Sequence, residues 1–146
     1  MNTAPAGDTP QLPFRSQVQL RFRDMDPVGH INNSVYATLL EQNRIAFQEQ
    51  PGGFREAADQ SAVLATQTIE FLREMRWPGT VEVRLGIGGL GRSSIRIHQE
   101  IHFDGTLIAR AQCTQVLIDN ADRKAVPISG AQRKMLAPWI IASQPE

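Results

Sequence analysis

Four strand-like runs follow one another closely in the second half of the chain, and they constrain the fold more than any other feature. Apolar and polar residues alternate through these runs, as is typical of half-buried strands. They cover residues 62–73, 80–88, 93–103 and 106–119. Asp104-Gly105 separates the last two and favours a tight hairpin. Because short connections join neighbouring strands in antiparallel order, the runs predict one antiparallel sheet.

A further strand and a long helix are predicted before these runs. Residues 16–23 alternate and predict a strand that buries Phe22. Asn32, Asn33 or Ser34 can cap a helix that runs to about Gln48. Its apolar arc is broad, so the helix should be largely buried. One long helix wrapped by a curved antiparallel sheet of about five strands is an α+β fold. We expect a free sheet edge in such a unit to pair with a second copy.

The composition excludes several classes of protein. The 146 residues carry 15 Lys and Arg against 15 Asp and Glu, which gives a formal net charge of zero and argues against nucleic-acid partners. No run approaches the roughly 20 apolar residues of a membrane span, so no membrane partner is expected. Cys113 is the single cysteine, which rules out an internal disulfide and suits a cytoplasmic location. Residues 1–14 contain three prolines and predict a disordered lead-in to a single domain at 15–146.

Two motifs resemble known sites but favour simpler interpretations. The glycines of 86–91 satisfy the dinucleotide pattern G-x-G-x-x-G, yet they lead into a strand instead of a helix. A bent or bulged strand junction is therefore the preferred interpretation. His98, Glu100 and His102 share one strand face, where a metal site is the alternative to an ordinary solvent face. We predict no metal site.

Two further positions have ordinary explanations. Cys113 lies within an alternating strand, which predicts a buried small side chain. Glu41 and Arg44 are three apart on the helix and predict a surface ion pair. The alternative is that they are polar groups near a site that holds a partner subunit or substrate.

The loop before the helix carries the strongest chemical signal. Asp24 and Asp26 lie a few residues before a helix whose first N–H groups have no helical partner. A carboxylate can act as a nucleophile or a general base, and a helix start can stabilise an oxyanion. Acyl transfer needs both groups. A plain turn or cap role stays open, as does a metal site that includes His30.

The same stretch carries a resemblance to a known family. Residues 24–36 read D-x-D-x-x-G-H-x-N-N-x-x-Y, and Glu41 and Arg44 then supply E-x-x-R. This pattern resembles the hotdog-fold acyl-CoA thioesterases, most closely the branch similar to 4-hydroxybenzoyl-CoA thioesterase. The resemblance covers about residues 16–136 and implies a hotdog fold.

The resemblance also implies roles for individual residues. Asp26 matches the catalytic base or nucleophile, and the backbone N–H of Asn33 matches the oxyanion donor. Asp24 is expected to brace the loop. Substrate-binding positions correspond to Gly29, His30 and Tyr36. Coenzyme A contacts correspond to Arg92, Ser93 and Ser94.

The implied substrate is an acyl-CoA, so coenzyme A is part of the substrate and no separate cofactor is expected. The implied assembly is a homodimer or a homotetramer of paired dimers, with the site at the dimer interface. Three alternatives stay open: an acyl-carrier-protein thioesterase, a non-catalytic acyl-thioester binding module, and a dehydratase or hydratase that uses His30. An acidic carrier would need a basic patch, for which the candidates are Arg21, Arg23, Arg92, Arg96, Arg123, Lys124, Arg133 and Lys134.

Overall fold

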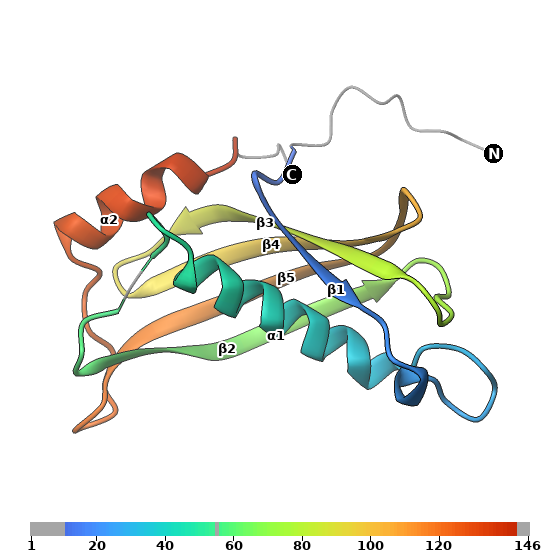
Figure 1. Ribbon diagram of the computed structural model, residues 1–146. Helices are drawn as coiled ribbons and strands as arrows, with labels where there is room; N and C mark the ends of the chain where they lie inside the picture. Colours follow the sequence, from blue (N-terminus) through green and yellow to red (C-terminus); the bar gives the residue numbers. More distant parts are fainter. Residues whose placement is uncertain (1–10, 55, 143–146) are drawn as a thin grey trace.

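The computed structural model describes residues 11–54 and 56–142. Five strands form one antiparallel sheet in the order β1-β3-β4-β5-β2, and the long helix α1 lies across one face of it (Figure 1). The strands are β1 (Phe14–Gln19), β2 (Gln60–Phe71), β3 (Thr80–Leu90), β4 (Ser94–Phe103) and β5 (Thr106–Asp119). The helices are α1 (Asn33–Glu49) and α2 (Gly130–Leu136), with short 3-10 turns at Phe22–Asp24 and Ala137–Trp139. The predicted α+β architecture is confirmed.

The tight hairpin and the bulged junction are both confirmed. Asp104 and Gly105 have φ values of 50° and 74°, the left-handed pair that a two-residue hairpin requires. Pairing between β3 and β4 shifts register between Ile87 and Gly89, so the glycine-rich stretch forms a bulge. A Cβ atom placed on Gly88 would clash with the His98 ring. Close packing against His98 therefore explains the glycine at that position, and dinucleotide binding is not needed as the explanation.

The first strand differs from its prediction at both ends. Leu12 is buried and β1 begins at Phe14, so the folded chain starts before residue 15. Residues 1–10 of the predicted lead-in lie outside the described residues. At its other end β1 stops at Gln19, and the prediction that Phe22 is buried is wrong, because its side chain is 67% exposed. The polar contacts of Asp24, described below, favour a 3-10 turn over continued alternation.

Helix α1 buries one face against the sheet and is capped by Asn32. The Asn32 side chain accepts a hydrogen bond from the backbone N–H of Ser34 at 2.9 Å. Two apolar clusters fill the space between helix and sheet. The first surrounds Tyr36 and Leu40 in the N-terminal half of α1. The second surrounds Phe47 and includes Leu136 of α2, which closes that end of the core.

A polar layer separates the two clusters. Arg44 is 5% exposed and donates to the side-chain oxygens of Gln67 and Gln99, both at 3.0 Å. Gln99 donates in turn to Asn43 Oδ1 at 2.8 Å. The predicted ion pair between Glu41 and Arg44 is wrong, since Arg44 points into the core while Glu41 is exposed. The helix therefore uses its arginine to contact the sheet.

Cys113 lies next to this layer and is buried, as predicted. Burial raises the pKa of its thiol, although the nearby Arg44 guanidinium acts in the opposite direction. A buried thiol with a raised pKa is a poor nucleophile. The structure therefore agrees with a packing role for this cysteine.

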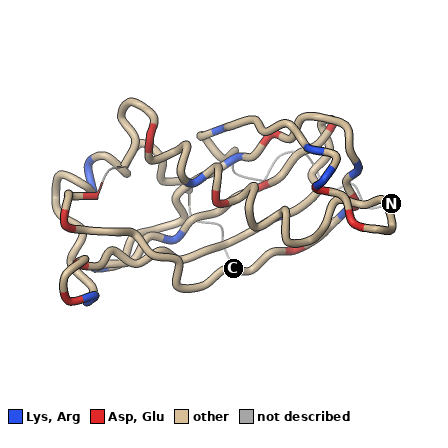
Figure 2. Tube along the Cα trace, turned by 60° about the horizontal axis from the view of Figure 1, so that its bottom comes forward, with Lys and Arg blue, Asp and Glu red and all other residues tan. Residues whose placement is uncertain are grey.

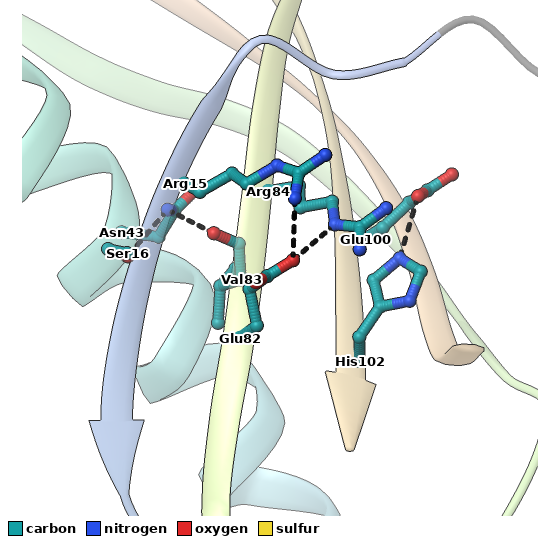
Figure 3. A network of polar contacts seen from close by, with 8 residues as sticks. All are labelled: Arg15, Ser16, Asn43, Glu82, Val83, Arg84, Glu100 and His102. Atoms are coloured by element: carbon teal, nitrogen blue, oxygen red, sulfur yellow. Dashed lines mark hydrogen bonds and ion pairs between the residues drawn. The ribbon is translucent and has the colours of Figure 1, made fainter. Parts of the chain in front are cut away.

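The outer face of the sheet is polar. Figure 3 shows Glu82 between Arg15 and Arg84, and His102 bonded to Glu100 at 2.9 Å. His98, Glu100 and His102 lie on the face away from Ile97 and Ile101, as predicted, although all three are only partly exposed. Within residues 11–54 and 56–142, no three His, Cys, Asp or Glu side chains are grouped so that they could hold a metal ion.

Charge is distributed over the whole described chain. Basic and acidic residues are interspersed along the trace in Figure 2, and neither sign occupies one half of the molecule. None of the described helices is long and apolar enough to cross a membrane.

Candidate active site

Backbone hydrogen bonds hold the Asp26 loop in one conformation. Oδ1 of Asp26 accepts from the backbone N–H groups of Val28 at 2.9 Å and His30 at 3.1 Å. The Asp26 N–H donates to the His30 carbonyl at 2.7 Å, and the Gly29 N–H donates to the Asp26 carbonyl at 3.0 Å. Gly29 has a φ of 88°, a conformation that glycine adopts without strain. These bonds orient Oδ1, and no donor among the described residues engages Oδ2.

Asp24 braces this loop, as expected. Its carboxylate is 6% exposed and accepts from the Arg21 backbone N–H at 2.8 Å and from the Arg21 guanidinium at 2.9 Å. Burial disfavours the ionised carboxylate, but the hydrogen bonds and charge of Arg21 outweigh that effect and lower the pKa of Asp24. The Asp24 carbonyl also accepts from the Asn32 N–H at 2.9 Å, which ties the loop to the helix start.

The first N–H group of α1 is available to a ligand. The Asn33 N–H has no acceptor among the described residues, whereas the next two N–H groups, on Ser34 and Val35, are bonded to Asn32. A free N–H at a helix N-terminus attracts an anionic oxygen, because the peptide dipoles add along the axis. The geometry suits an oxyanion donor.

One cleft brings half of the eight predicted site residues together. It has a volume of about 360 Å³, opens to solvent and is lined by the Asp26 loop, the start of α1 and residues 71–75. Four predicted residues line it: Asp26, His30, Asn33 and Tyr36. Gly29 does not line it and instead shapes the loop. The volume is within the usual range for small-molecule sites.

His30 and Tyr36 differ in their surroundings. His30 Nε2 lies 3.1 Å from Glu74 Oε2 and 3.0 Å from a guanidinium nitrogen of Arg76, and which of the two it bonds depends on the tautomer. Tyr36 is 2% exposed, and its ring packs edge-to-face on Phe71 with the centroids 5.0 Å apart. Burial, together with the nearby Glu74 charge, raises the pKa of Tyr36. Its hydroxyl therefore stays protonated and can donate.

The predicted coenzyme A contacts lie elsewhere in the chain. Arg92 and Ser93 form the turn between β3 and β4, and Ser94 begins β4. This turn is beside α2, at the opposite end of the sheet from the Asp26 loop (Figure 1). The 11 residues of β3 separate the two ends by about 33 Å, since a strand rises roughly 3.3 Å per residue. One chain does not bring Arg92 to its own cleft.

The connection between β2 and β3 supplies cleft residues that sequence reasoning missed. Arg73, Glu74 and Met75 line the cleft, and the Ile31 N–H donates to the Met75 carbonyl at 2.8 Å. The only available signal was the charged stretch 73–76 directly after a predicted strand. Its position beside the Asp26 loop depends on the sheet order, which the sequence does not display.

Comparison with known proteins supports this architecture. The Bacillus subtilis (strain 168) protein YsmA, described only as uncharacterized, is 26% identical over 85 residues, a match that spans 58% of this chain and 58% of YsmA. The PA5185 protein of Pseudomonas aeruginosa PAO1 superimposes with a TM-score of 0.82 at 20% identity, covering 92% of this chain and 96% of that one. A thioesterase from Thermus thermophilus, complexed with coenzyme A and Zn, has a TM-score of 0.75 at 27% identity. The match covers 86% of this chain and 92% of that one.

One long helix across an antiparallel sheet, with a cleft at the helix start, defines a hotdog-fold protein. More specifically, the chain belongs to the Thioesterase-like superfamily, whose family model matches residues 20–140.

Proposed function

We propose that this protein hydrolyses an acyl-CoA thioester to a free acid and coenzyme A. The observation that carries the proposal is that Asp26 and Asn33 line one cleft, where the carboxylate is oriented by two backbone donors and the helix N–H is free. These are the two groups that thioester hydrolysis needs.

Asp26 either removes a proton from water or attacks the carbonyl carbon itself. In the first route, the resulting hydroxide bonds to the carbonyl carbon and the C=O electrons move to oxygen. The Asn33 N–H and the helix dipole stabilise that oxyanion. When the intermediate collapses, the C–S bond breaks and the thiolate leaves, to be protonated to the thiol. In the second route, the Asp26 carboxylate attacks the carbonyl carbon, the C–S bond breaks to leave an acyl anhydride with Asp26, and the departing thiolate takes a proton from solvent. Water then hydrolyses the anhydride to the free acid and restores the Asp26 carboxylate.

Gly29, His30 and Tyr36 are assigned to substrate binding. Tyr36 and Phe71 form an apolar wall for the acyl group, with His30 at the rim. Gly29 acts through the loop turn that orients Asp26. The Thermus thermophilus thioesterase in complex with coenzyme A supports coenzyme A as the thiol portion.

We also propose that the active form is a homodimer, with a homotetramer of two such dimers as the larger assembly that the resemblance implies. Strand β2 is at one edge of the sheet, and no described strand pairs along its outer side. Pairing of two such edges would extend the sheet and satisfy their free backbone groups. A second copy could then bring its Arg92, Ser93 and Ser94 toward coenzyme A bound in the first.

The deciding experiment measures thiol release from a panel of acetyl-, hexanoyl-, palmitoyl-, benzoyl- and phenylacetyl-CoA. Asp26→Asn is the matched variant, because the asparagine oxygen can still accept from Val28 and His30 and so preserve the loop. We expect turnover on one acyl class, and a loss of at least about a hundredfold in the variant. Turnover that survives in Asp26→Asn would reject the assignment of Asp26. Binding of acyl-CoA without turnover in the wild type would favour a binding module, and turnover only on loaded carrier would favour a carrier-protein thioesterase.

A further inference from the structure

Two arginines without a carboxylate partner lie beside the cleft. Arg73 lines the cleft, and Arg76 contacts the cleft residue His30; both side chains are exposed. No carboxylate of the described residues lies within ion-pair distance of either. Nearby Arg21 differs, since its charge is paired with Asp24 at 2.9 Å. The β2–β3 connection therefore presents two arginines without an ion-pair partner among the described residues, beside the Glu74 carboxylate that contacts the same His30 nitrogen as Arg76.

Arg76 also lies beside the catalytic loop. One guanidinium nitrogen lies 3.0 Å from His30 Nε2, which leaves the other N–H groups of the fork free. A guanidinium with two parallel free N–H groups matches the oxygens of a phosphate. The connection that carries it is fixed to the catalytic loop by the hydrogen bond from Ile31 to Met75 at 2.8 Å. The backbone of this connection is thus placed beside the Asp26 loop.

We propose that Arg73 and Arg76 bind the phosphate of a phosphopantetheine arm as it leaves the cleft. This inference rests on the proposed thioester hydrolysis. The thioester sulfur is at one end of that arm and the phosphate at the other. When the carbonyl reaches Asp26, the phosphate is therefore near the rim, where the two arginines are exposed. These residues belong to the same chain as Asp26, in contrast to Arg92, which would have to come from a second copy.

Coenzyme A and a loaded carrier protein both contain this phosphate, so the experiment uses substrates that separate the sources. The same acyl group is presented as acyl-CoA, as acyl-4′-phosphopantetheine, as acyl-pantetheine without phosphate and on a carrier protein. The variants are Arg73→Ala, Arg76→Ala, the double variant and Arg76→Lys. Lys124→Ala is the matched control, because Lys124 is an exposed cation in the turn after β5, at the end of the sheet away from the cleft.

The expected signature is a change in KM confined to phosphate-bearing substrates. Each alanine variant should raise the KM for acyl-CoA about five- to tenfold, as expected for loss of a charge-assisted hydrogen bond at a solvated site, while kcat stays within about twofold. Acyl-pantetheine should show no change. Arg76→Lys should recover only part of the loss, because an ammonium cannot bind bidentately. Arg92→Ala, tested in parallel, measures how much the β3–β4 turn contributes to the KM for acyl-CoA.

Three outcomes would overturn the inference. The first is an unchanged KM for acyl-CoA in the double variant. The second is an equal rise for acyl-pantetheine, which would assign the arginines to the acyl or pantetheine portion. The third is an equal effect of Lys124→Ala, which would indicate a general charge effect. Larger effects on the loaded carrier than on acyl-CoA would identify the carrier as the source of the phosphate.

If the wild type hydrolyses none of these substrates, the proposed function fails, and calorimetric titration with coenzyme A then tests the binding inference separately. Retained affinity in the double variant would overturn it. A loss of affinity, with an unchanged unfolding temperature, would support it.

Discussion

The guanidinium of Arg44 donates a hydrogen bond to the side-chain oxygen of Gln99 at 3.0 Å inside the core. Gln99 is 1% exposed and also donates to the Leu40 carbonyl at 2.9 Å, so it links two turns of α1 to β4. A shift of α1 along the sheet would leave these buried groups unpaired, which is costly. The layer therefore fixes the position of α1, and with it the position of the Asn33 N–H at its start.

The first prediction concerns this layer. Gln99→Leu should lower the free energy of unfolding by about 2–4 kcal/mol, because a buried charge loses one of its two acceptors and the Asn43 oxygen loses its donor. Adding Arg44→Met should cost less than the sum of the two single variants, since the two groups interact. Urea unfolding of the four proteins measures the coupling. Strict additivity would mean that the pair does not interact.

The second prediction separates the two roles of Asp26. Asp26→Asn should keep wild-type stability, whereas Asp26→Ala should lose about 1–2 kcal/mol, because the Val28 and His30 N–H groups lose their acceptor. Turnover should fall strongly in both. Urea titrations and thiol-release assays on the same samples provide the comparison. Equal stability of the two variants would show that the side-chain bonds do not support the loop.

The third prediction concerns pH. The folded-state pKa of Asp24 is lowered from the ordinary value of 3.8, so its contribution to stability is present above that value and is lost as the pH falls through the lower folded value. Asp24→Asn should be less stable than wild type at pH 7, because it loses the ion pair with Arg21. The loss should be only about 1 kcal/mol, since the Arg21 side chain is largely exposed to solvent. The difference should shrink as the pH falls below 3.8 toward the lower folded-state pKa. Denaturant unfolding across that range would contradict the prediction if the gap stayed constant.

The fourth prediction compares two glycines that both have open space where a side chain would be added. A Cβ atom meets nothing within 4 Å at Gly29 or at Gly130. Gly29 has a φ of 88°, so Gly29→Ala should cost about 1–2 kcal/mol and lower turnover through the loop. Gly130 is at the start of α2, where alanine should be neutral or stabilising by up to about 1 kcal/mol. Thermal unfolding of the two variants tests the prediction. Equal changes in their unfolding temperatures would show that backbone strain at Gly29 is not the cause.

Local patterns predicted most of the secondary structure. Alternation located β3, β4 and β5, and the left-handed pair at Asp104 and Gly105 followed from turn chemistry. Prediction was poorest where side chains compete with the pattern. The apolar and polar alternation of residues 16–23 predicted a strand through Phe22. The strand ends at Gln19 instead, and the hydrogen bonds of Asp24 with Arg21 stabilise a 3-10 turn there. The spacing of Glu41 and Arg44 on α1 predicted an ion pair. Arg44 instead donates to side-chain oxygens of the sheet.

Residues close together in the chain predict the helices, the strands and the candidate catalytic loop, because periodicity, capping and the Asp26 motif are local patterns. The distant residues that join this loop are selected by tertiary contacts. The strand order sets the end of β2 beside the start of α1, so Arg73 and Arg76 reach the cleft while Arg92 is at the far end of the sheet. Contacts of this kind are decided by how strands pair across the sheet, and a linear pattern does not contain that information.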